Sequence, residues 1–279
     1  MRFFSKLLAT LTLFLLTQVT GRAQTPAPAS SSAPPTAAAA APATSAPAAP
    51  SVSSGKPVNA TDAFNAGVSA YDAGDFVKAR DQFLAAENTA VSPALEYNLG
   101  NAFFQNSDYG QAVLHYLRSL SLDPRNPDAR QNLAMAWQAA SVAVPEPTRL
   151  DQLAANLSRN GWTLALTICG WVALYLLFLP KLYRWRGAAP WLLCATFFIG
   201  AVVAAAALYG VSLHANDGVV LHADTSLKIS PSANSKPTGL LQPGETAEIL
   251  QRHGNYFDVR TADGRAGWVE DSNYAPVWE

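Results

Sequence analysis

The sequence predicts a multidomain membrane protein with three folded parts: an all-α repeat stack, a two-helix transmembrane hairpin and a small all-β barrel. Two long apolar stretches, a period of 33 to 34 residues before them, and short alternating apolar runs after them support this reading. The expected order is a signal peptide (1–23), a disordered Ala/Pro/Ser linker (24–59), helical repeats (60–144), an amphipathic juxtamembrane helix (148–160), a first transmembrane helix (162–180), a cytoplasmic loop (181–189), a second transmembrane helix (190–213) and the β-domain (217–279).

The apolar stretches, 162–180 and 190–213, contain no Asp, Glu, Lys or Arg. Each has about the 20 residues that a helix needs to cross a hydrocarbon core of roughly 30 Å. The link between them carries Lys181, Arg184 and Arg186 and no acidic residue. Because cationic loops are retained in the cytoplasm, both flanking parts are expected in the periplasm. The alternative is a buried helical pair in a soluble core, which such long charge-free runs disfavour.

The second stretch is rich in small residues, and Gly200 and Ala204, like Ala206 and Gly210, are four apart on one helix face. Such a face lets two helix backbones approach closely in lipid. It either packs against the first span, which we favour, or forms a seat for another membrane protein.

Composition narrows the possible functions. The chain has 19 Lys and Arg against 20 Asp and Glu, so its charge gives no case for nucleic-acid binding. Cys169 and Cys194 lie in different spans, with an expected axial offset of about 10 Å at the helical rise. That offset exceeds the reach of a disulfide, about 7 Å between Cα atoms. Both cysteines are therefore expected to be small apolar residues.

The N-terminus has the features of an export signal. Arg2 and Lys6 precede an apolar run at 7–16, and small residues end the segment at Ala23. Cleavage is expected after Ala23, and an uncleaved anchor is the alternative; both export the following segment. The linker that follows is almost only Ala, Pro, Ser and Thr, a composition that favours an extended, disordered tether.

Residues 60–144 repeat themselves, and each unit is predicted to be two helices joined by a tight turn, at 74–75 and 107–108. Small residues are expected where helices touch, and aromatic residues are expected to fill the gap. The segment resembles tetratricopeptide repeats in period and in its A-x-x-x-F spacing, although no Trp begins a unit. Two units plus one helix are predicted, from the recurrence of Gly67 as Gly100, Phe83 as Tyr116 and Leu99 as Leu133.

The resemblance to these repeats implies a protein-binding role and an inner face formed by the first helix of each unit. That face is aromatic and polar with almost no cations, so it is not suited to gripping a terminal carboxylate. For each aromatic residue, filling the core is the alternative. The predicted groove residues are Phe64, Tyr71, Tyr97, Asn101, Phe104, Gln105 and Gln131.

From residue 217 the chain alternates short apolar runs with turns at 243–244, 254–255 and 263–264, which predicts five or six strands. The runs 227–229, 241–244, 256–260 and 263–269 resemble a bacterial SH3 domain. Tyr256 replaces the usual Trp of one strand, and Ser230 and Pro231 replace the usual arginine-containing turn. Such domains often bind cell-wall peptides or proteins, and a passive spacer or dimer module is the alternative. Tyr256 and Trp268 are the expected surface residues.

The sequence gives little support for an enzyme. It has neither a Gly-rich phosphate loop nor a nucleophile motif, and its four histidines lack partners at metal-ligand spacing. We therefore expect no catalytic residue, cofactor or metal. His115 is expected to be solvated or to cap a helix, and a weak metal site at His214 and His222, with Asp217 and Asp224, remains an alternative.

The order of parts is similar to that of the exported Bat aerotolerance proteins of the BatE type. The runs 96–104 and 126–133 carry this resemblance, which extends over about 61–279. It implies a non-enzymatic component that works with von Willebrand-type membrane proteins and a MoxR-type ATPase in the envelope. Three functions stay open: a protein-binding scaffold, a cell-wall sensor and a regulatory subunit of an envelope enzyme.

Overall fold

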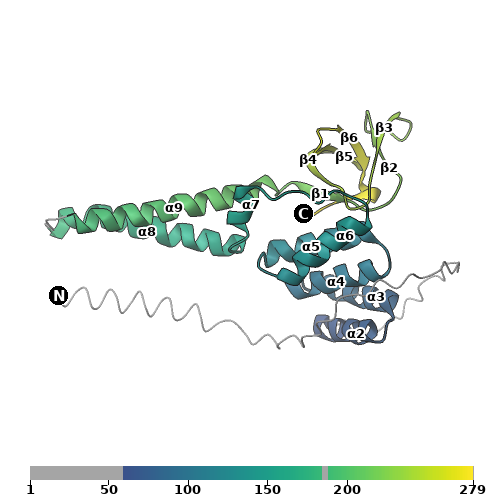
Figure 1. Cartoon of the computed structure of the whole chain (residues 1–279), viewed down its shortest axis with the longest axis horizontal. Helices are drawn as coiled ribbons and strands as arrows, with labels where there is room; N and C mark the ends of the chain where they lie inside the picture. The colour runs from purple at the N-terminus through teal and green to yellow at the C-terminus, as the bar shows by residue number, and fades with distance from the viewer. Residues whose placement is uncertain (1–58, 184–187, 279) are drawn as a thin grey trace. The chain divides into compact units, whose positions relative to one another are not determined.

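The computed structural model describes residues 59–183 and 188–278 (Figure 1). The predicted signal peptide, the linker up to residue 58 and the middle of the predicted cytoplasmic loop lie outside the described residues. Within them, a helical repeat region is followed by two long apolar helices and then by an antiparallel β-sheet, as the sequence predicts.

The repeat stack consists of five helices that pack in chain order, and the first helices of successive units also contact one another. Each helix begins at a side chain that accepts a backbone N–H of the first turn, which satisfies a donor that the helix itself cannot. The helices are α2 (Ala60–Asp72), α3 (Phe76–Glu87), α4 (Pro93–Gln105), α5 (Tyr109–Leu122) and α6 (Pro127–Ala139).

The same turn ends each first helix. Gly74, Ser107 and Ser141 have positive φ angles of 79°, 62° and 60°. The following residue donates its N–H back to a carbonyl five positions earlier, from Asp75 to Ala70 and likewise in the other units. These bonds satisfy carbonyls that the helix end leaves unpaired. Residues 74–75 and 107–108 thus form the predicted turns.

Close contact between paired helices depends on Gly67 and Gly100. A Cβ atom on Gly67 would lie 2.5 Å from the Phe83 ring, and one on Gly100 would lie 2.6 Å from the Tyr116 ring. The two rings are almost fully buried. The predicted pairing of a small residue on one helix with an aromatic residue on the next is therefore what fills the core.

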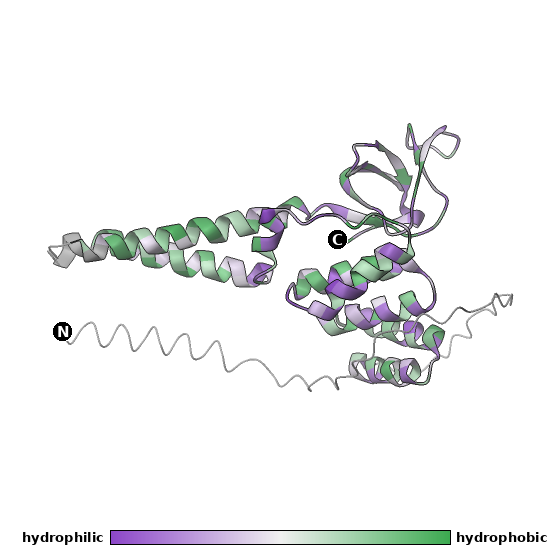
Figure 2. Cartoon of the chain, in the orientation of Figure 1, coloured by the Kyte–Doolittle hydropathy of each residue, from purple (hydrophilic) through white to green (hydrophobic). Residues whose placement is uncertain are grey.

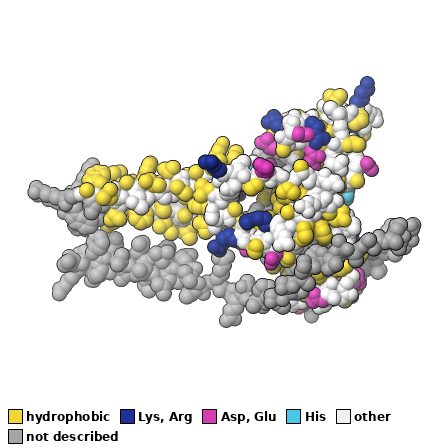
Figure 3. Space-filling model, viewed as in Figure 1, with side chains coloured by type: hydrophobic (Ala, Val, Ile, Leu, Met, Phe, Trp, Pro, Cys, Tyr) yellow, Lys and Arg dark blue, Asp and Glu magenta, His cyan; other side chains and the backbone are white. Residues whose placement is uncertain are grey.

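Helices α8 (Arg159–Tyr183) and α9 (Ala189–Leu213) run side by side (Figure 1). Their most apolar parts, Arg159–Phe178 and Trp191–Leu213, are long and apolar enough to cross a membrane. Only 11% of each apolar window is buried, which is unlike a core helix of a soluble protein. Figure 2 shows that hydrophobic residues predominate along this pair, and Figure 3 shows hydrophobic side chains on its surface, in contrast to the charged side chains on the repeats and strands.

The small-residue face of α9 packs within the chain. Gly200 lies against the sulfur of Cys169, and Ala204 and Ala207 are buried with Trp162. Of the two alternatives, the structure therefore favours packing against the first span. Cys169 and Cys194 are both free, in agreement with the expected offset.

The predicted amphipathic helix at 148–160 is wrong in extent. Helix α7 covers only Arg149–Ala154, and α8 already begins at Arg159. The Asn156 side chain donates to the carbonyls of Gln152 and Leu153, which ends α7. The chain can then turn so that Trp162 Nε1 donates to the Ala154 carbonyl at 3.0 Å. Periodicity alone did not reveal this break.

The β-domain is one antiparallel sheet of seven strands in the order β3-β2-β6-β5-β4-β1-β7. Leu227, Phe257, Val259 and Val269 are among the buried residues of its core. The sequence reasoning missed β7, and the closed barrel stays a prediction. The strands are β1 (Asp217–Val220), β2 (Thr225–Lys228), β3 (Pro237–Leu241), β4 (Thr246–His253), β5 (Tyr256–Thr261), β6 (Ala266–Glu270) and β7 (Tyr274–Pro276), with a 3-10 turn, η1 (Asp271–Asn273), before β7.

Replacing Gly100 by Leu is expected to lower the free energy of unfolding of the repeat stack by about 1 to 3 kcal/mol, because the new side chain overlaps the Tyr116 ring. Urea unfolding of the intact chain in detergent, followed by helical circular dichroism, measures the change. Gly239→Ala is the control, because no atom lies within 4 Å of its Cβ position, and it should change stability by less than about 1 kcal/mol. Equal unfolding curves for the two variants would contradict the assigned helix contact.

Candidate functional site

The predicted groove residues all lie on the first helices of the units. Phe64 and Tyr71 come from α2, Gln131 comes from α6, and the other four come from α4. Gln131 is exposed, whereas the other six are half-buried. Helix α4 contacts both α2 and α6, so the three first helices are neighbours, and their predicted groove residues are here called the inner face.

The aromatic residues of the inner face also stabilise the stack. The Phe64 ring packs on Phe83 at a centroid distance of 5.7 Å, and the Tyr97 ring packs on Tyr116 at 6.2 Å. Phe104 similarly contacts Tyr109 at 5.6 Å. Each pair joins the two helices of one unit. The core-filling alternative therefore holds in part, and only the outer portions of these rings are available to a ligand.

A hydrogen-bond network crosses the inner face from α4 to α6. The Tyr116 hydroxyl donates to Asn101 Oδ1 at 2.7 Å. Asn132 Nδ2 donates to the same oxygen at 2.9 Å and to the Tyr97 hydroxyl at 3.2 Å. Sequence reasoning missed Asn132, because its residue type gave no sign that α6 would place it beside Asn101.

Two amide groups of this network still have binding capacity. Asn101 Nδ2 and Asn132 Oδ1 have no hydrogen-bond partner among the described residues. Every buried side-chain nitrogen or oxygen in the described part of the chain has a partner, so these two atoms must be accessible to solvent. One is a donor and the other is an acceptor, which is the complement of a peptide main chain.

The hydroxyl groups of Tyr71 and Tyr116 are neutral at neutral pH. Burial raises the pKa of Tyr71, although a hydrogen bond with Gln105 opposes the rise. Burial likewise raises the pKa of Tyr116. The face therefore offers neutral donors and acceptors, which suits an uncharged segment more than a carboxylate or a phosphate.

A buried ionic cluster lies beneath the stack surface. His115 is only 3% exposed, and its Nδ1 lies 2.8 Å from an oxygen of Glu96, which is 1% exposed. Arg118 pairs with Glu87 at 3.3 Å, and burial raises the pKa of Glu87. The expectation that His115 is solvated or caps a helix is wrong, because α5 turns it inward against the Phe103 ring.

In the described part of the chain, Glu87, Glu96 and His115 are the group whose possible ligand atoms could share a metal ion, all within 4.8 Å of one another. Glu96 already lies 2.8 Å from His115, and Glu87 already pairs with Arg118. An ion-pair cluster therefore accounts for the geometry.

The sheet carries a second set of functional candidates on the face opposite its core. Trp268 lies in register with Lys228 on one side and Asp258 on the other. The Lys228 ammonium lies 5.2 Å from the Tyr256 ring centre, and the His253 ring meets Trp268 edge-on at 6.3 Å. Tyr256 and Trp268 thus share a half-buried outer face, and sequence reasoning missed the charged neighbours that complete it.

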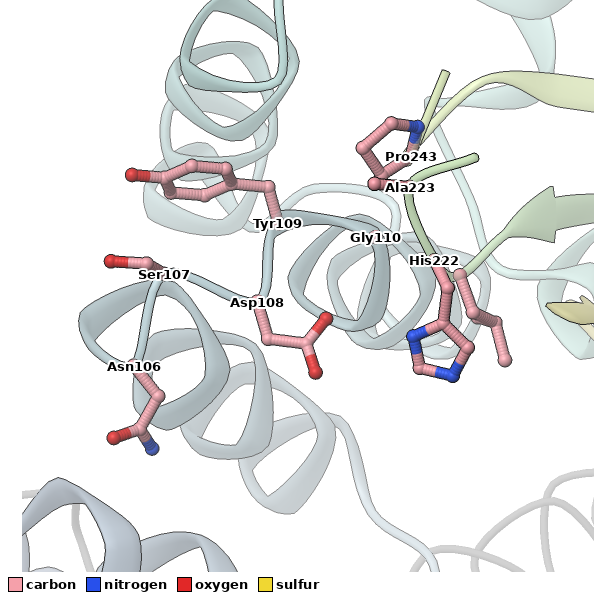
Figure 4. Close-up of a pocket in the computed structure, with 9 residues that line it drawn as sticks. Asn106, Ser107, Asp108, Tyr109, Gly110, His222, Ala223 and Pro243 are labelled. Carbon is pink, nitrogen blue, oxygen red and sulfur yellow. The ribbon is translucent and has the colours of Figure 1, made fainter. Parts of the chain in front are cut away.

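The cleft drawn in Figure 4 has a volume of about 240 Å³, less than the usual size of a small-molecule site. The cleft lies between the α4–α5 turn and the segment after β1, and that segment contains His222. His214 instead pairs with Asp217 and Asp151, so the two histidines proposed as a weak metal site have different neighbours. The cleft is lined by Asn106, Ser107, Asp108, Tyr109, Gly110, Leu221, His222, Ala223 and Pro243.

Two stretches of the chain match known families. Residues 224–274 match a bacterial SH3 domain, and residues 100–139 match a TPR repeat, that is, a tetratricopeptide repeat. No curated protein matches the chain. The matches agree with the helical repeats and the β-domain, and both kinds of domain point to protein interaction, with cell-wall binding as a possibility for the SH3 domain.

His214 joins three parts of the chain, because it follows α9, and its partners Asp151 and Asp217 belong to α7 and β1. Its Nδ1 lies 2.6 Å from Asp217, and its Nε2 lies 3.0 Å from Asp151. The hydrogen bond to Asp217 raises the pKa of His214 to about 9, although partial burial opposes the rise. At neutral pH the imidazolium therefore holds both carboxylates.

We expect this contribution to stability to be complete below pH 6.5 and to be lost as the pH rises through about 9, because the folded-state pKa of His214 is raised. The effect is modest, because more than half of the side chain is exposed. Melting temperatures of the intact chain between pH 6 and 10 should show a fall that His214→Gln removes. His253→Gln is the control and should keep the wild-type profile; an unchanged profile in His214→Gln contradicts the assignment.

Proposed function

We propose that this chain is a non-enzymatic scaffold of the bacterial inner membrane, whose inner face binds a segment of another exported or membrane-anchored protein. The free donor on Asn101 and the free acceptor on Asn132 carry the proposal, because they sit side by side in a network that fixes their positions. A peptide main chain presents the matching carbonyl and N–H. The match of residues 100–139 to a TPR repeat supports this interpretation.

The chemistry of the inner face indicates the kind of segment that it takes. Its half-buried Tyr97 and Phe104 rings offer apolar contacts beside the amides, and aromatic residues contribute much of the binding energy at interfaces. The predicted groove residues include no Lys, Arg, Asp or Glu. We therefore propose an uncharged segment, bound with little dependence on salt.

Contact between the two water-soluble parts supports the proposed topology. Trp137 Nε1 in α6 donates to the Gly244 carbonyl of the β-domain at 3.1 Å, although both apolar helices lie between them in the chain. Two parts in contact lie on one side of a membrane, and two spans return the chain to that side. Lys181, Arg184 and Arg186 favour a cytoplasmic loop, which puts both parts in the periplasm.

The resemblance to BatE-type proteins leads us to propose von Willebrand-type membrane proteins as partners, in a Bat and MoxR-type system for envelope stress or aerotolerance. A membrane-anchored partner would gain effective concentration, because the hairpin holds the inner face close to the bilayer.

A second candidate function is a cell-wall sensor, favoured by the outer face of the sheet. Tyr256 and Trp268 there stand beside the ammonium of Lys228 and the carboxylate of Asp258. Cell-wall peptides carry both charges, so this face offers complementary groups. The match of residues 224–274 to a bacterial SH3 domain agrees with this candidate. A regulatory subunit of an envelope enzyme is the third function, and its partner would be that enzyme.

Tyr97→Ala combined with Phe104→Ala is expected to reduce co-purification of a specific membrane partner at least tenfold. The double variant removes two aromatic contacts with the partner, and a loss of about 1.4 kcal/mol of binding free energy already weakens affinity tenfold. Gln105→Ala combined with Gln131→Ala tests the same face with less disturbance of the core. Val77→Ala is the control, because Val77 is 53% exposed on a second helix. If every partner survives both double variants but is lost in Tyr256→Ala combined with Trp268→Ala, the β-domain is the binding site.

The topology is tested with alkaline-phosphatase fusions after residues 160, 187 and 279. The proposal predicts active enzyme at 160 and 279 and inactive enzyme at 187, because alkaline phosphatase folds only where disulfides form. A green fluorescent protein fusion at 187 should be fluorescent. Inactive phosphatase at residue 279 would overturn the periplasmic placement of the β-domain.

A further inference from the structure

Strand β1 is buried on both of its faces. Val220 belongs to the core of the sheet, whereas Val219 and Leu221, on either side of it, belong to the same hydrophobic cluster as the repeat helices. Val219 and Val220 are 0% exposed, and Leu221 is 8% exposed. A strand covered on both faces needs consecutive apolar residues, which explains the unbroken run at 219–221.

Strand β7 and the residues after it repeat this division. Tyr274 points into the core of the sheet, whereas Ala275 and Val277 pack with the repeat helices. Both β1 and β7 therefore face the helical stack, and they pair with each other at one edge of the sheet. The stack-facing residues Val219, Leu221, Ala275 and Val277 all lie outside the stretch that matches an SH3 domain.

Polar bonds fix the same contact. Trp137 Nε1, which is buried, donates to the Gly244 carbonyl at 3.1 Å. Arg118 donates from Nε to the Val277 carbonyl at 3.0 Å and from Nη2 to the Pro276 carbonyl at 3.3 Å. Arg118 also pairs with Glu87, so it connects the ionic cluster of the stack to the end of β7.

A glycine in the first turn of α5 marks the point of closest approach. A Cβ atom on Gly110 would overlap the Leu221 carbonyl oxygen, and its next neighbours also belong to β1 and the residue after it. Glycine within a helix costs about 1 kcal/mol relative to alanine. None of the three atoms nearest to this Cβ position belongs to the stack itself. The contact with the β-domain therefore explains why residue 110 is a glycine.

The stack has an incomplete unit at this end. Ser141 makes the same turn that precedes α3 and α5, with Val142 donating to the Trp137 carbonyl. In the first two units Asp75 and Asp108 then cap the next helix. Val142, at the matching position, has no side-chain acceptor that could cap a helix, and no helix follows before α7. Helices α5 and α6 therefore lack the second helix that would cover them.

We propose that the β1–β7 edge of the β-domain, together with the turn at Gly244, is the C-terminal cap of the repeat stack, bound to α5 and α6 in place of the missing second helix of the third unit. The interaction surface is on the stack, and its partner is the β-domain of the same chain. The open end of a short repeat array needs such a cover, because each unit buries its apolar face only against a neighbour.

The cap leaves both candidate binding faces uncovered. The inner face is formed by α2, α4 and α6, and the cap contacts α5 and Trp137 of α6. The outer face of the sheet is formed by residues of β2, β5 and β6, whereas the cap uses β1, β7 and the turn at Gly244. The β-domain therefore stabilises the stack without competing with a ligand at either face.

Hydrogen–deuterium exchange of the intact chain in detergent tests the cap. Leu221→Asp places a charge in the contact from the sheet side, and Gly110→Leu separates the surfaces from the stack side. We expect amide exchange in α5 and α6 to rise about tenfold or more in both variants, because local opening sets the exchange rate. Ile229→Asp is the control, because Ile229 is 67% exposed on the same domain, and it should leave α5 and α6 protected.

The location of the faster exchange decides the outcome. Faster exchange in α5 and α6 supports the cap, whether or not the sheet itself stays protected in Leu221→Asp. Unchanged protection of α5 and α6 in Gly110→Leu overturns the proposal, because the stack would then not depend on the contact. Unchanged protection of these helices beside an unfolded sheet in Leu221→Asp overturns it equally.

Discussion

The burial of Val219, Leu221 and Val277 against the helices of the repeat stack is the contact on which the arrangement of the water-soluble parts depends. It joins segments that are separated in the sequence by two apolar helices. Apolar side chains supply its area, and the bonds of Trp137 and Arg118 fix its geometry. The pair of apolar helices is also tied to its neighbours, because His214 connects α9 to α7 and β1.

The residues of the inner face contribute to packing and, in the proposed function, also to recognition of a ligand. The rings of Phe64, Tyr97 and Phe104 pack against rings of the second helices. Removing them would therefore affect the packing of the core as well as the binding of a ligand. The amides of Asn101 and Asn132 are held by internal bonds that leave one donor and one acceptor exposed. Fixed polar groups lose little entropy when a ligand binds, which favours recognition by a preorganised surface.

Charge is distributed differently in the two candidate faces. In the stack, Glu87 pairs with Arg118, and Glu96 lies 2.8 Å from His115. The predicted residues of the inner face include no Lys, Arg, Asp or Glu and offer neutral donors and acceptors. The outer face of the sheet instead combines Tyr256 and Trp268 with charges of both signs. The two faces thus suit ligands of different chemistry on one scaffold.

Local features could be predicted from the sequence alone: the repeat period, the tight turns at Gly74 and Ser107, the apolar spans and most strands. These depend on residues close in the chain, whose spacing records helix or strand geometry. Tertiary structure decided what distant segments do together. The break after α7, the burial of His115, the role of Asn132 and the contact of Gly110 with Leu221 all depend on which surfaces meet. No local pattern records those partners, because burial and hydrogen bonding between distant residues are properties of the folded chain.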